Sequence, residues 1–154
     1  MDTQCTRGKG FTLIELLMTV AIAAILVSLA APSFVRLIAD QRAKAAATDL
    51  VTALNVTRSE AIKHNQNVTL QPKSGDWANG WQVKDPDGGA DLLDANATGV
   101  PITGGPGSVI YNSGGRLAGA VAAPTFLIGE SGMPQRCLSV DLSGRPRITA
   151  SACS

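Results

Sequence analysis

The sequence predicts an α+β protein in which one long N-terminal helix packs on a small antiparallel β-sheet domain. Two observations carry this prediction. An apolar run near the N-terminus continues into a long segment whose apolar residues have helical spacing, and short β-type segments bounded by turn-forming residues fill the remainder. A chain of 154 residues is long enough for one modest domain, so we expect a single hydrophobic core.

The apolar run extends from residue 11 to residue 31, and Glu15 is its only charged side chain. Its length of about 21 residues is enough to cross the ~30 Å hydrocarbon core of a bilayer as a helix. Arg7 and Lys9 lie on its N-terminal side. The positive-inside rule therefore leaves the leader in the cytoplasm and sends everything after Ala31 across the membrane.

The same region can also be interpreted as an ordinary secretory signal. Arg7 and Lys9 would then form the basic part, residues 16–27 the apolar part, and residues 28–30 a small-x-small cleavage site. Glu15 argues against this alternative, because a carboxylate in an apolar stretch costs about 2.5 kcal/mol or more and is tolerated mainly where it has a partner. A signal that is discarded has no use for such a group.

From residue 32 to residue 65 the pattern becomes that of an amphipathic helix, with charged residues on one face. No Gly or Pro occurs between Ser33 and His64, so the apolar run and this segment can form one helix, which Pro32 should bend or loosen by one turn. Asn65 offers a stop signal. The apolar face consists of Val35, Ile38, Ala39, Ala43, Ala46, Leu50, Ala53, Leu54 and Ala61.

Beyond Asn65 the residues are typical of short strands separated by turns. Ser143 and Gly144 lie between the last two strand segments and predict a hairpin. Residues 84–107 hold several Gly, Pro and Asp residues and predict a long surface loop, to which we assign no function. The expected strands span residues 67–71, 80–83, 108–111, 125–128, 136–141 and 145–149.

The residues around Gly10 indicate the class of protein. The run KGFTLIELL, residues 9–17, resembles the processing site of type IV pilins and type II secretion pseudopilins, with a basic leader ending in Gly, then Phe11, and Glu15 at the fifth position after the cut. The resemblance implies a type IV pilin-like fold. It also implies that a prepilin peptidase cleaves between Gly10 and Phe11, methylates the new Phe11 amine and leaves the helix on the product.

Glu15 has a physical use in such a filament. A buried carboxylate becomes tolerable when an opposite charge lies close by, and the Phe11 ammonium of the adjoining subunit would be such a charge. The resemblance implies that this pairing sets the axial stagger of the subunits, and Pro32 stands where many family members have a helix-disrupting proline. The implied partners are other major and minor pilins, the prepilin peptidase, the inner-membrane assembly platform and, before assembly, membrane lipid.

The implied organisation has four parts. Residues 1–10 form the leader, 11–31 the transmembrane and assembly half of the helix, 32–65 its amphipathic half, and 66–154 a β domain. The subunit would be a single-pass inner-membrane protein with this domain in the periplasm, and would then enter a pilus at the cell surface.

Cysteine usage adds one further expectation. Removal of the leader takes Cys5 away and leaves Cys137 and Cys153. In an oxidising compartment this pair predicts a disulfide that closes a loop of about 17 residues and contributes about 3 kcal/mol. Two free buried thiols are the alternative.

The rest of the chain resembles the GspH and FimT/FimU branch of minor pilins and minor pseudopilins. Residues 58–63 (RSEAIK) resemble the end of their long helix, residues 77–83 (WANGWQV) a tryptophan-containing strand region, and residues 143–147 (SGRPR) a late Gly-Arg-x-Arg turn. The resemblance implies a minor pilin that takes part in assembly and priming at the tip of a type IV pilus. The alternative is a GspH-type minor pseudopilin of a type II secretion system.

The Gly-Arg-x-Arg turn also suggests that the protein binds DNA. In competence-associated FimT proteins such a motif is associated with binding incoming DNA for natural transformation, so the resemblance points to Gly144, Arg145 and Arg147. Residues two apart on a strand project to the same side about 6.5 Å apart, close to the spacing of phosphates along one strand. Arg116 and Arg136 could widen the patch. The alternative is a set of solvated hairpin arginines, tied to a nearby acid or to a neighbouring pilin.

Charge and composition argue against other classes. The net charge is +1, and the leader contains two of the 13 basic and one of the 12 acidic side chains, so the mature chain would be nearly neutral and any DNA site must be local. His64 is the only histidine, the carboxylates are scattered, and no glycine-rich phosphate loop follows a strand. We therefore expect no enzymatic activity, no cofactor and no metal site.

Overall fold

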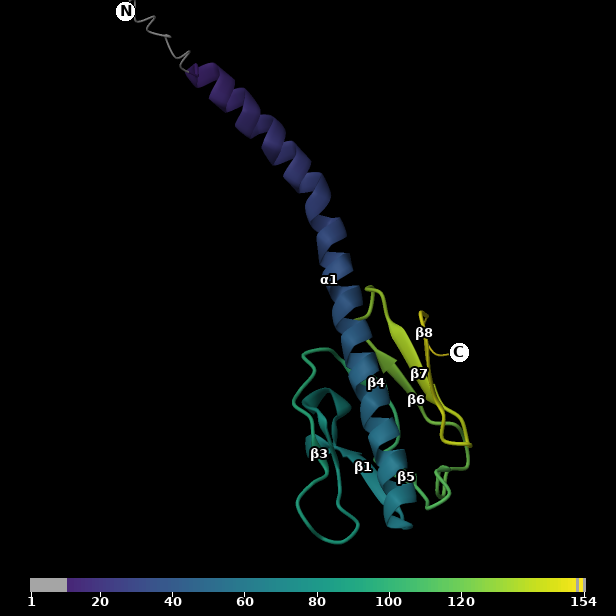
Figure 1. The fold of residues 1–154 in the computed structure, drawn as a ribbon. Helices are drawn as coiled ribbons and strands as arrows, with labels where there is room; N and C mark the ends of the chain where they lie inside the picture. The colour runs from purple at the N-terminus through teal and green to yellow at the C-terminus, as the bar shows by residue number, and fades with distance from the viewer. Residues whose placement is uncertain (1–10, 152, 154) are drawn as a thin grey trace, which may run out of the picture. The chain divides into compact units, whose positions relative to one another are not determined.

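The computed structural model describes residues 11–151 and residue 153; the predicted leader lies outside the described residues. The chain divides into two units, the first ending at Val35 and the second beginning at Arg36. Helix α1 runs from Leu13 to His64 and contributes to both units (Figure 1). It continues through Pro32 and ends before Asn65, whose φ of 52° is a left-handed conformation that commonly follows a helix end.

The first unit is a helix without a covering layer. Every residue from Phe11 to Val35 is exposed, even those with large apolar side chains. Among the described residues, α1 alone contains a stretch that is long and apolar enough to cross a membrane, and none of that stretch is buried. This unit has the length and composition of the predicted membrane segment.

The second unit adds two four-stranded antiparallel sheets, where the sequence predicted one small sheet. The first has the order β3-β2-β1-β5, built from β1 (Val68–Pro72), β2 (Trp81–Val83), β3 (Leu93–Asp94) and β5 (Val109–Tyr111). The second has the order β4-β6-β7-β8, built from β4 (Ile102–Gly104), β6 (Thr125–Ile128), β7 (Arg136–Val140) and β8 (Pro146–Thr149). Two 3-10 turns, η1 (Lys73–Gly75) and η2 (Trp77–Asn79), connect β1 to β2.

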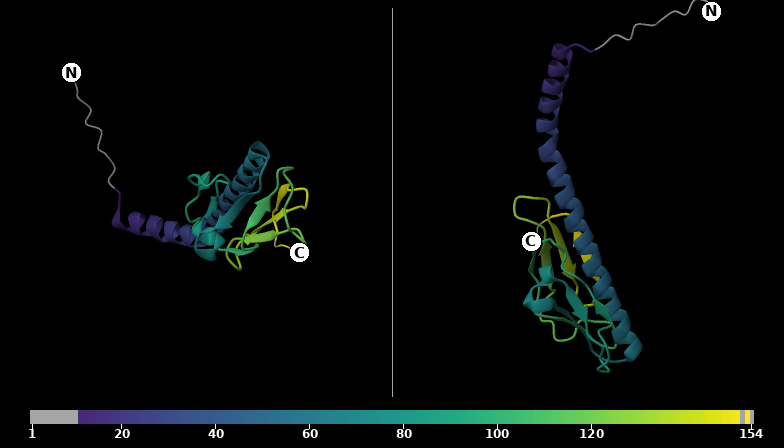
Figure 2. Two further views of the ribbon diagram at one scale, coloured as in Figure 1. Left: turned by 90° about the horizontal axis from the view of Figure 1, so that it is seen from below. Right: turned by 90° about the vertical axis from the view of Figure 1, so that its left-hand side faces the viewer.

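One core joins the second part of α1 to both sheets. Figure 2 shows this part of the helix lying along the strands in two views. The helix presents mostly small residues to the core, and the largest side chains of that core come from the sheets and the turn before β2. Trp81, Tyr111 and Phe126 are the largest fully buried side chains. The buried helix residues are Ala43, Ala46, Ala47, Leu50, Ala53, Leu54, Thr57 and Ala61.

The apolar face predicted for the helix is buried over most of its length. The core on α1 begins at Ala43, whereas Ile38 is exposed and Ala39 only half-buried. Val35, at the end of the first unit, is exposed. The sheets therefore cover the predicted face only from Ala43 onward.

Residues 84–107 differ from the single surface loop that the sequence predicted. They contain β3, which pairs with β2, and β4, which pairs with β6, so this segment supplies an edge strand to each sheet. Val100 and Ile102 are buried in the core. Strands of two and three residues are too short to show an alternating pattern, which explains why they were missed.

Candidate functional sites: the start of the helix and an arginine-bearing turn

The first candidate site is the start of α1. The Thr12 hydroxyl accepts a hydrogen bond from the Glu15 N–H at 3.2 Å. In return the Glu15 carboxylate accepts from the Thr12 N–H at 3.3 Å and from the Thr12 hydroxyl at 3.1 Å. This reciprocal pair is a capping box, which satisfies backbone donors that the first helical turn leaves free.

The capping box gives Glu15 a role within its own subunit. A Thr followed three residues later by Glu, just before an apolar run, is a sequence signal for this arrangement, and it is absent from the expectations above. Glu15 takes part in no ion pair within the part of the chain that the structure describes. Phe11 and Pro32 are both exposed in the same unit, and Gly10 lies outside the described residues.

The second candidate site is the hairpin between β7 and β8, which the sequence predicted. The Asp141 N–H donates to the Arg145 carbonyl at 3.1 Å, and the Gly144 N–H donates to the Asp141 carbonyl at 2.8 Å. Gly144 has a φ of 83°, in the left-handed region that favours glycine. The result is a three-residue loop in which Gly144 takes the left-handed position, a common hairpin connection.

Asp141 organises this turn. Its Oδ1 atom accepts hydrogen bonds from the Ser143 hydroxyl at 2.6 Å and from the Arg145 N–H at 3.0 Å. The hydrogen bond from Ser143, followed by that from the Arg145 backbone, holds the pKa of Asp141 below its ordinary value. The carboxylate is therefore charged at neutral pH and fixes the backbone from which Arg145 projects.

Arg145 and Arg147 are both exposed, Arg145 at the end of the turn and Arg147 in β8 opposite Ser139. Neither arginine forms an ion pair with any other described residue. Arg145 directly precedes β8 and Arg147 is its second residue, and this is the spacing at which strand residues project to one side. Both guanidinium groups are free to meet an external anion.

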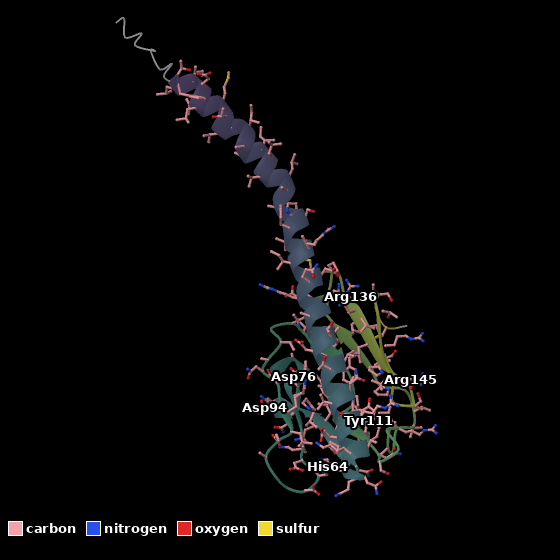
Figure 3. The ribbon with its side chains drawn as sticks, in the orientation of Figure 1. His64, Asp76, Asp94, Tyr111, Arg136 and Arg145 are labelled. Carbon is pink, nitrogen blue, oxygen red and sulfur yellow. A yellow bond between two sulfur atoms is a disulfide. The ribbon has the colours of Figure 1, made fainter. Side chains whose placement is uncertain are left out.

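Arg136, which the sequence analysis added to this patch, does not belong to it. It lies at the end of β7 far from the turn, and its guanidinium forms an ion pair with Asp40 of α1. Its side chain is only 18% exposed, and its Nε atom is buried without a hydrogen-bond partner. Arg136 therefore fastens β7 to the helix, and Figure 3 shows it well apart from Arg145.

Arg116, the other added residue, does lie beside the hairpin. It closes the turn after β5, where its carbonyl accepts from the Asn112 N–H at 2.9 Å, and its side chain is exposed. A Cβ atom at Gly144 would lie only 2.5 Å from the Gly115 carbonyl oxygen, so the two turns are in backbone contact. Arg116 and Arg145 each directly follow one of these glycines.

Tyr111 fastens the two turns, a role that no local sequence pattern indicates. Its ring is fully buried, and its hydroxyl donates to the Gly144 carbonyl at 3.1 Å. Burial raises the pKa of Tyr111 to about 12; the charge of Arg58 opposes this shift, and that of Asp141 adds to it. The hydroxyl therefore keeps its proton at neutral pH and remains a donor.

The predicted disulfide is present. Cys137 in β7 is bonded to Cys153, 16 positions later, with their Cα atoms 5.0 Å apart. The bond secures the chain that follows β8 against β7. It lies toward the end of β7 remote from the turn, because Cys137 pairs with Thr149 at the end of β8.

A further cluster surrounds His64 at the end of α1. Its Nδ1 atom lies 2.8 Å from Asp87 Oδ2, and its Nε2 atom lies 3.3 Å from Glu60 Oε2. Ring and carboxylate atoms of His64, Asp85 and Asp87 lie within 4.8 Å of one another. These carboxylates are scattered in the sequence, and they meet His64 only because the loop after β2 returns to the helix end. The hydrogen bond between His64 and Asp87 ties this loop to α1.

Two solved structures share this fold. The chain is similar to the type IV minor pilin FimU of Pseudomonas aeruginosa strain PAO1 in two crystal forms. For space group P65 the TM-score is 0.62 at 23% identity, covering 72% of this chain and 97% of that chain. For space group P21 the TM-score is 0.63 at 23% identity, covering 74% of this chain and 94% of that chain. A search of curated proteins found no match.

Family models match both parts of the chain. The model described as type II transport protein GspH matches residues 46–144, well over half of the sequence. The model described as the prokaryotic N-terminal methylation motif matches residues 5–31. Together with the long helix, the antiparallel sheets and the disulfide, these matches identify the chain as a member of the GspH family, a type IV pilin-like protein of the minor pilin and pseudopilin class.

Proposed function

We propose that the chain is a minor pilin of a type IV pilus that takes part in assembly and priming at the tip. The observation that carries this proposal is the first unit of the structure, a helix whose apolar side chains are all exposed and which bears one carboxylate, Glu15. Such a surface is stable in lipid or among other apolar helices, and not in water. The match to the N-terminal methylation motif supports processing between Gly10 and Phe11.

In this proposal the membrane holds the helix until assembly, with the second unit in the periplasm. Cleavage then creates a charged amine at Phe11, close in sequence to Glu15. In the filament the Glu15 carboxylate meets the Phe11 ammonium of an adjoining subunit, which offsets the cost of removing each charge from water. A wrong register would leave both charges unpaired, so the pair selects one axial stagger.

The mass of the mature N-terminal peptide tests the processing step. We expect a chain that begins at Phe11 and carries one methyl group on its amine. A mature chain that begins at Ala31 would contradict the proposal and return the protein to the class of ordinary exported proteins.

A role as a minor pseudopilin of a type II secretion system is the second candidate, and the match to the GspH family favours it. Deletion of the gene separates the two candidates. Loss of twitching motility with intact protein export supports the pilus, whereas loss of export with intact twitching supports the secretion system.

We further propose that the hairpin binds DNA through Arg145 and Arg147, with Arg116 beside them and Gly144 shaping the turn. The supporting observation is that all three arginines are exposed and free of ion pairs within the described residues. A few phosphate contacts support only weak, salt-sensitive binding without sequence preference. A pilus tip would therefore need several copies, or other DNA-binding partners, for tight capture.

Binding of a fluorescent duplex to the full mature chain in neutral detergent tests this second proposal. We expect binding that weakens as salt rises and is lost when Arg145 and Arg147 are both changed to Gln. Arg42→Gln is the matched control, because Arg42 is exposed on α1 and forms no ion pair with other described residues. No salt-dependent binding, or equal binding by the double variant, would contradict DNA binding at this turn.

A further inference from the structure

Two Gly-Arg pairs from distant parts of the sequence meet in the second unit. Gly115 and Gly144 are both buried, and both have positive φ values, 69° and 83°. The Gly115 carbonyl oxygen occupies the space where a side chain at Gly144 would begin. This backbone contact places the residues that follow, Arg116 and Arg145, on the same part of the surface.

Arg58 of α1 lies beneath this contact. A Cβ atom at Gly115 would lie 3.0 Å from Arg58 Nε and 2.8 Å from Ile62 Cδ1, so the Arg58 side chain runs against the turn after β5. Arg58 is half-buried, and none of the ion pairs found among the described residues includes it. The helix thus adds a positive charge next to the turn after β5, and this charge acts on Tyr111.

Tyr111 links the two turns. It ends β5, directly before the turn that carries Arg116, and its ring lies against Gly144. Its hydroxyl donates to the Gly144 carbonyl, which fastens the hairpin that carries Arg145. One buried side chain therefore joins the end of β5 to the hairpin, beside the backbone contact between Gly115 and Gly144.

One carboxylate lies in the same region. Asp141 directs its Oδ1 atom at the hydroxyl of Ser143 and the N–H of Arg145, inside its own turn. It lowers the net charge of the cluster but forms no ion pair with Arg58, Arg116 or Arg145 in the structure described for residues 11–151. The cluster keeps a net positive charge.

We propose that Arg58, Arg116 and Arg145 form one site for the phosphodiester backbone of DNA, and that Tyr111 is the positioning residue that holds it together. This inference rests on the DNA-binding function proposed above and extends it to α1. Guanidinium groups match phosphate oxygens with paired N–H donors. Arg58 is half-buried, so water screens its charge less than that of a fully exposed arginine.

Arg58→Gln in the full mature chain, in neutral detergent, tests the extension to the helix. The measurement is Kd for a short fluorescent duplex over a series of salt concentrations. Loss of one phosphate contact should weaken binding about tenfold near 50 mM salt and reduce the salt slope of log K by about 0.9. Arg42→Gln, elsewhere on the same helix, should change neither quantity.

Tyr111→Phe tests the positioning role, because it removes the hydroxyl without changing any charge. A smaller salt slope in this variant would mean that the arginines no longer reach the phosphates together. A general loss of stability would not change the slope as long as the variant remains folded. Circular dichroism establishes that the variant is folded. If it does not fold, the result for Arg58→Gln decides the proposal.

The outcomes separate this inference from the function on which it rests. Wild-type affinity and slope in Arg58→Gln, together with loss of binding in the Arg145 and Arg147 double variant, would overturn the role of the helix and leave DNA binding at the hairpin. Absence of salt-dependent binding by the wild type would overturn both. Displacement of the duplex by inorganic phosphate at an equal concentration of phosphate groups would mark a free-anion site and overturn the assignment to DNA.

Discussion

The two parts of α1 are both rich in apolar residues, but their surroundings differ. From Phe11 to Val35 every side chain is exposed, whereas between Ala43 and Ala61 one face is buried under two sheets. The second part carries its own covering layer in the same chain. The first part needs another phase, lipid or the helices of other subunits, to cover it. The stability of the subunit therefore comes from the second part of the helix, and we propose that its assembly depends on the first.

Removal of one leucine side chain from each part should give the largest contrast. Leu50→Ala leaves a cavity in the core, because Leu50 is fully buried, and should lower the free energy of unfolding by about 4 kcal/mol. Leu26 is 63% exposed, so Leu26→Ala should change the free energy of unfolding by less than about 0.5 kcal/mol. Urea unfolding in neutral detergent measures both. Trp77 and Trp81 are the fluorescent probes, since both are buried in the second unit.

A similar loss of stability in the two leucine variants would contradict this division of roles. It would mean that the first unit contributes to the fold of the second.

The disulfide should account for the next largest effect. Cys153→Ser opens the loop that Cys137 and Cys153 close and should lower the free energy of unfolding by about 3 kcal/mol, slightly less than the loss for the most damaging core truncations. The same urea experiment checks this value. Reductant should bring the wild type to the level of the variant, and an unchanged wild-type midpoint in reductant would show that the bond does not stabilise the second unit.

The contact between the two turns should make a smaller contribution to stability. Comparison with a second glycine of similar φ separates this contribution from the cost of the backbone conformation. Gly144→Ala combines a positive φ with a Cβ atom placed 2.5 Å from the Gly115 carbonyl oxygen, and should cost about 2 kcal/mol. Gly132 has nearly the same φ, 81°, but open space around it, so Gly132→Ala should cost only about 1 kcal/mol. Equal losses in thermal unfolding would mean that the two turns do not press on each other.

The smallest expected effect is a dependence of the hairpin on pH. Hydrogen bonds, of which that from the Ser143 side chain has the largest effect, lower the pKa of Asp141 in the folded chain. The contribution of the Asp141 carboxylate to the stability of the hairpin is therefore complete above the ordinary Asp pKa of about 3.9. It is lost as the pH falls through the lower pKa of the folded chain. The amide NMR signal of Arg145, which donates to Asp141, should move only in this acid range. A signal that already moves near neutral pH would contradict the assignment.

Local patterns in the sequence were enough to predict the long helix, its end at Asn65, most of the strands and the β7–β8 hairpin. Each of these depends on residues close together in the chain. The capping box of Thr12 and Glu15 was equally visible, as a Thr and a Glu three positions apart. Glu15 thus has two roles to which its sequence context points, one as a charge in an apolar stretch and one as a helix cap.

Contacts between distant residues could not be predicted from the sequence. Asp40 and Arg136 are 96 positions apart, so nothing in the local pattern shows that Arg136 belongs to the helix contact and not to the arginine patch. Tyr111 and Gly144 are 33 positions apart and meet only because β5 and the hairpin pack on the same core. The strands β3 and β4 are defined by their partners, since their own residues carry too short a pattern.

Incorporation of Glu15 variants into filaments is the decisive comparison. Glu15→Gln removes the charge but keeps an oxygen that can accept from Thr12, whereas Glu15→Ala removes both the charge and the cap. We expect both variants to be processed and to keep a folded second unit, yet to be absent from sheared filaments in an immunoblot. Incorporation of Glu15→Ala at the wild-type level would contradict the pairing of Glu15 with the amine of a neighbouring subunit.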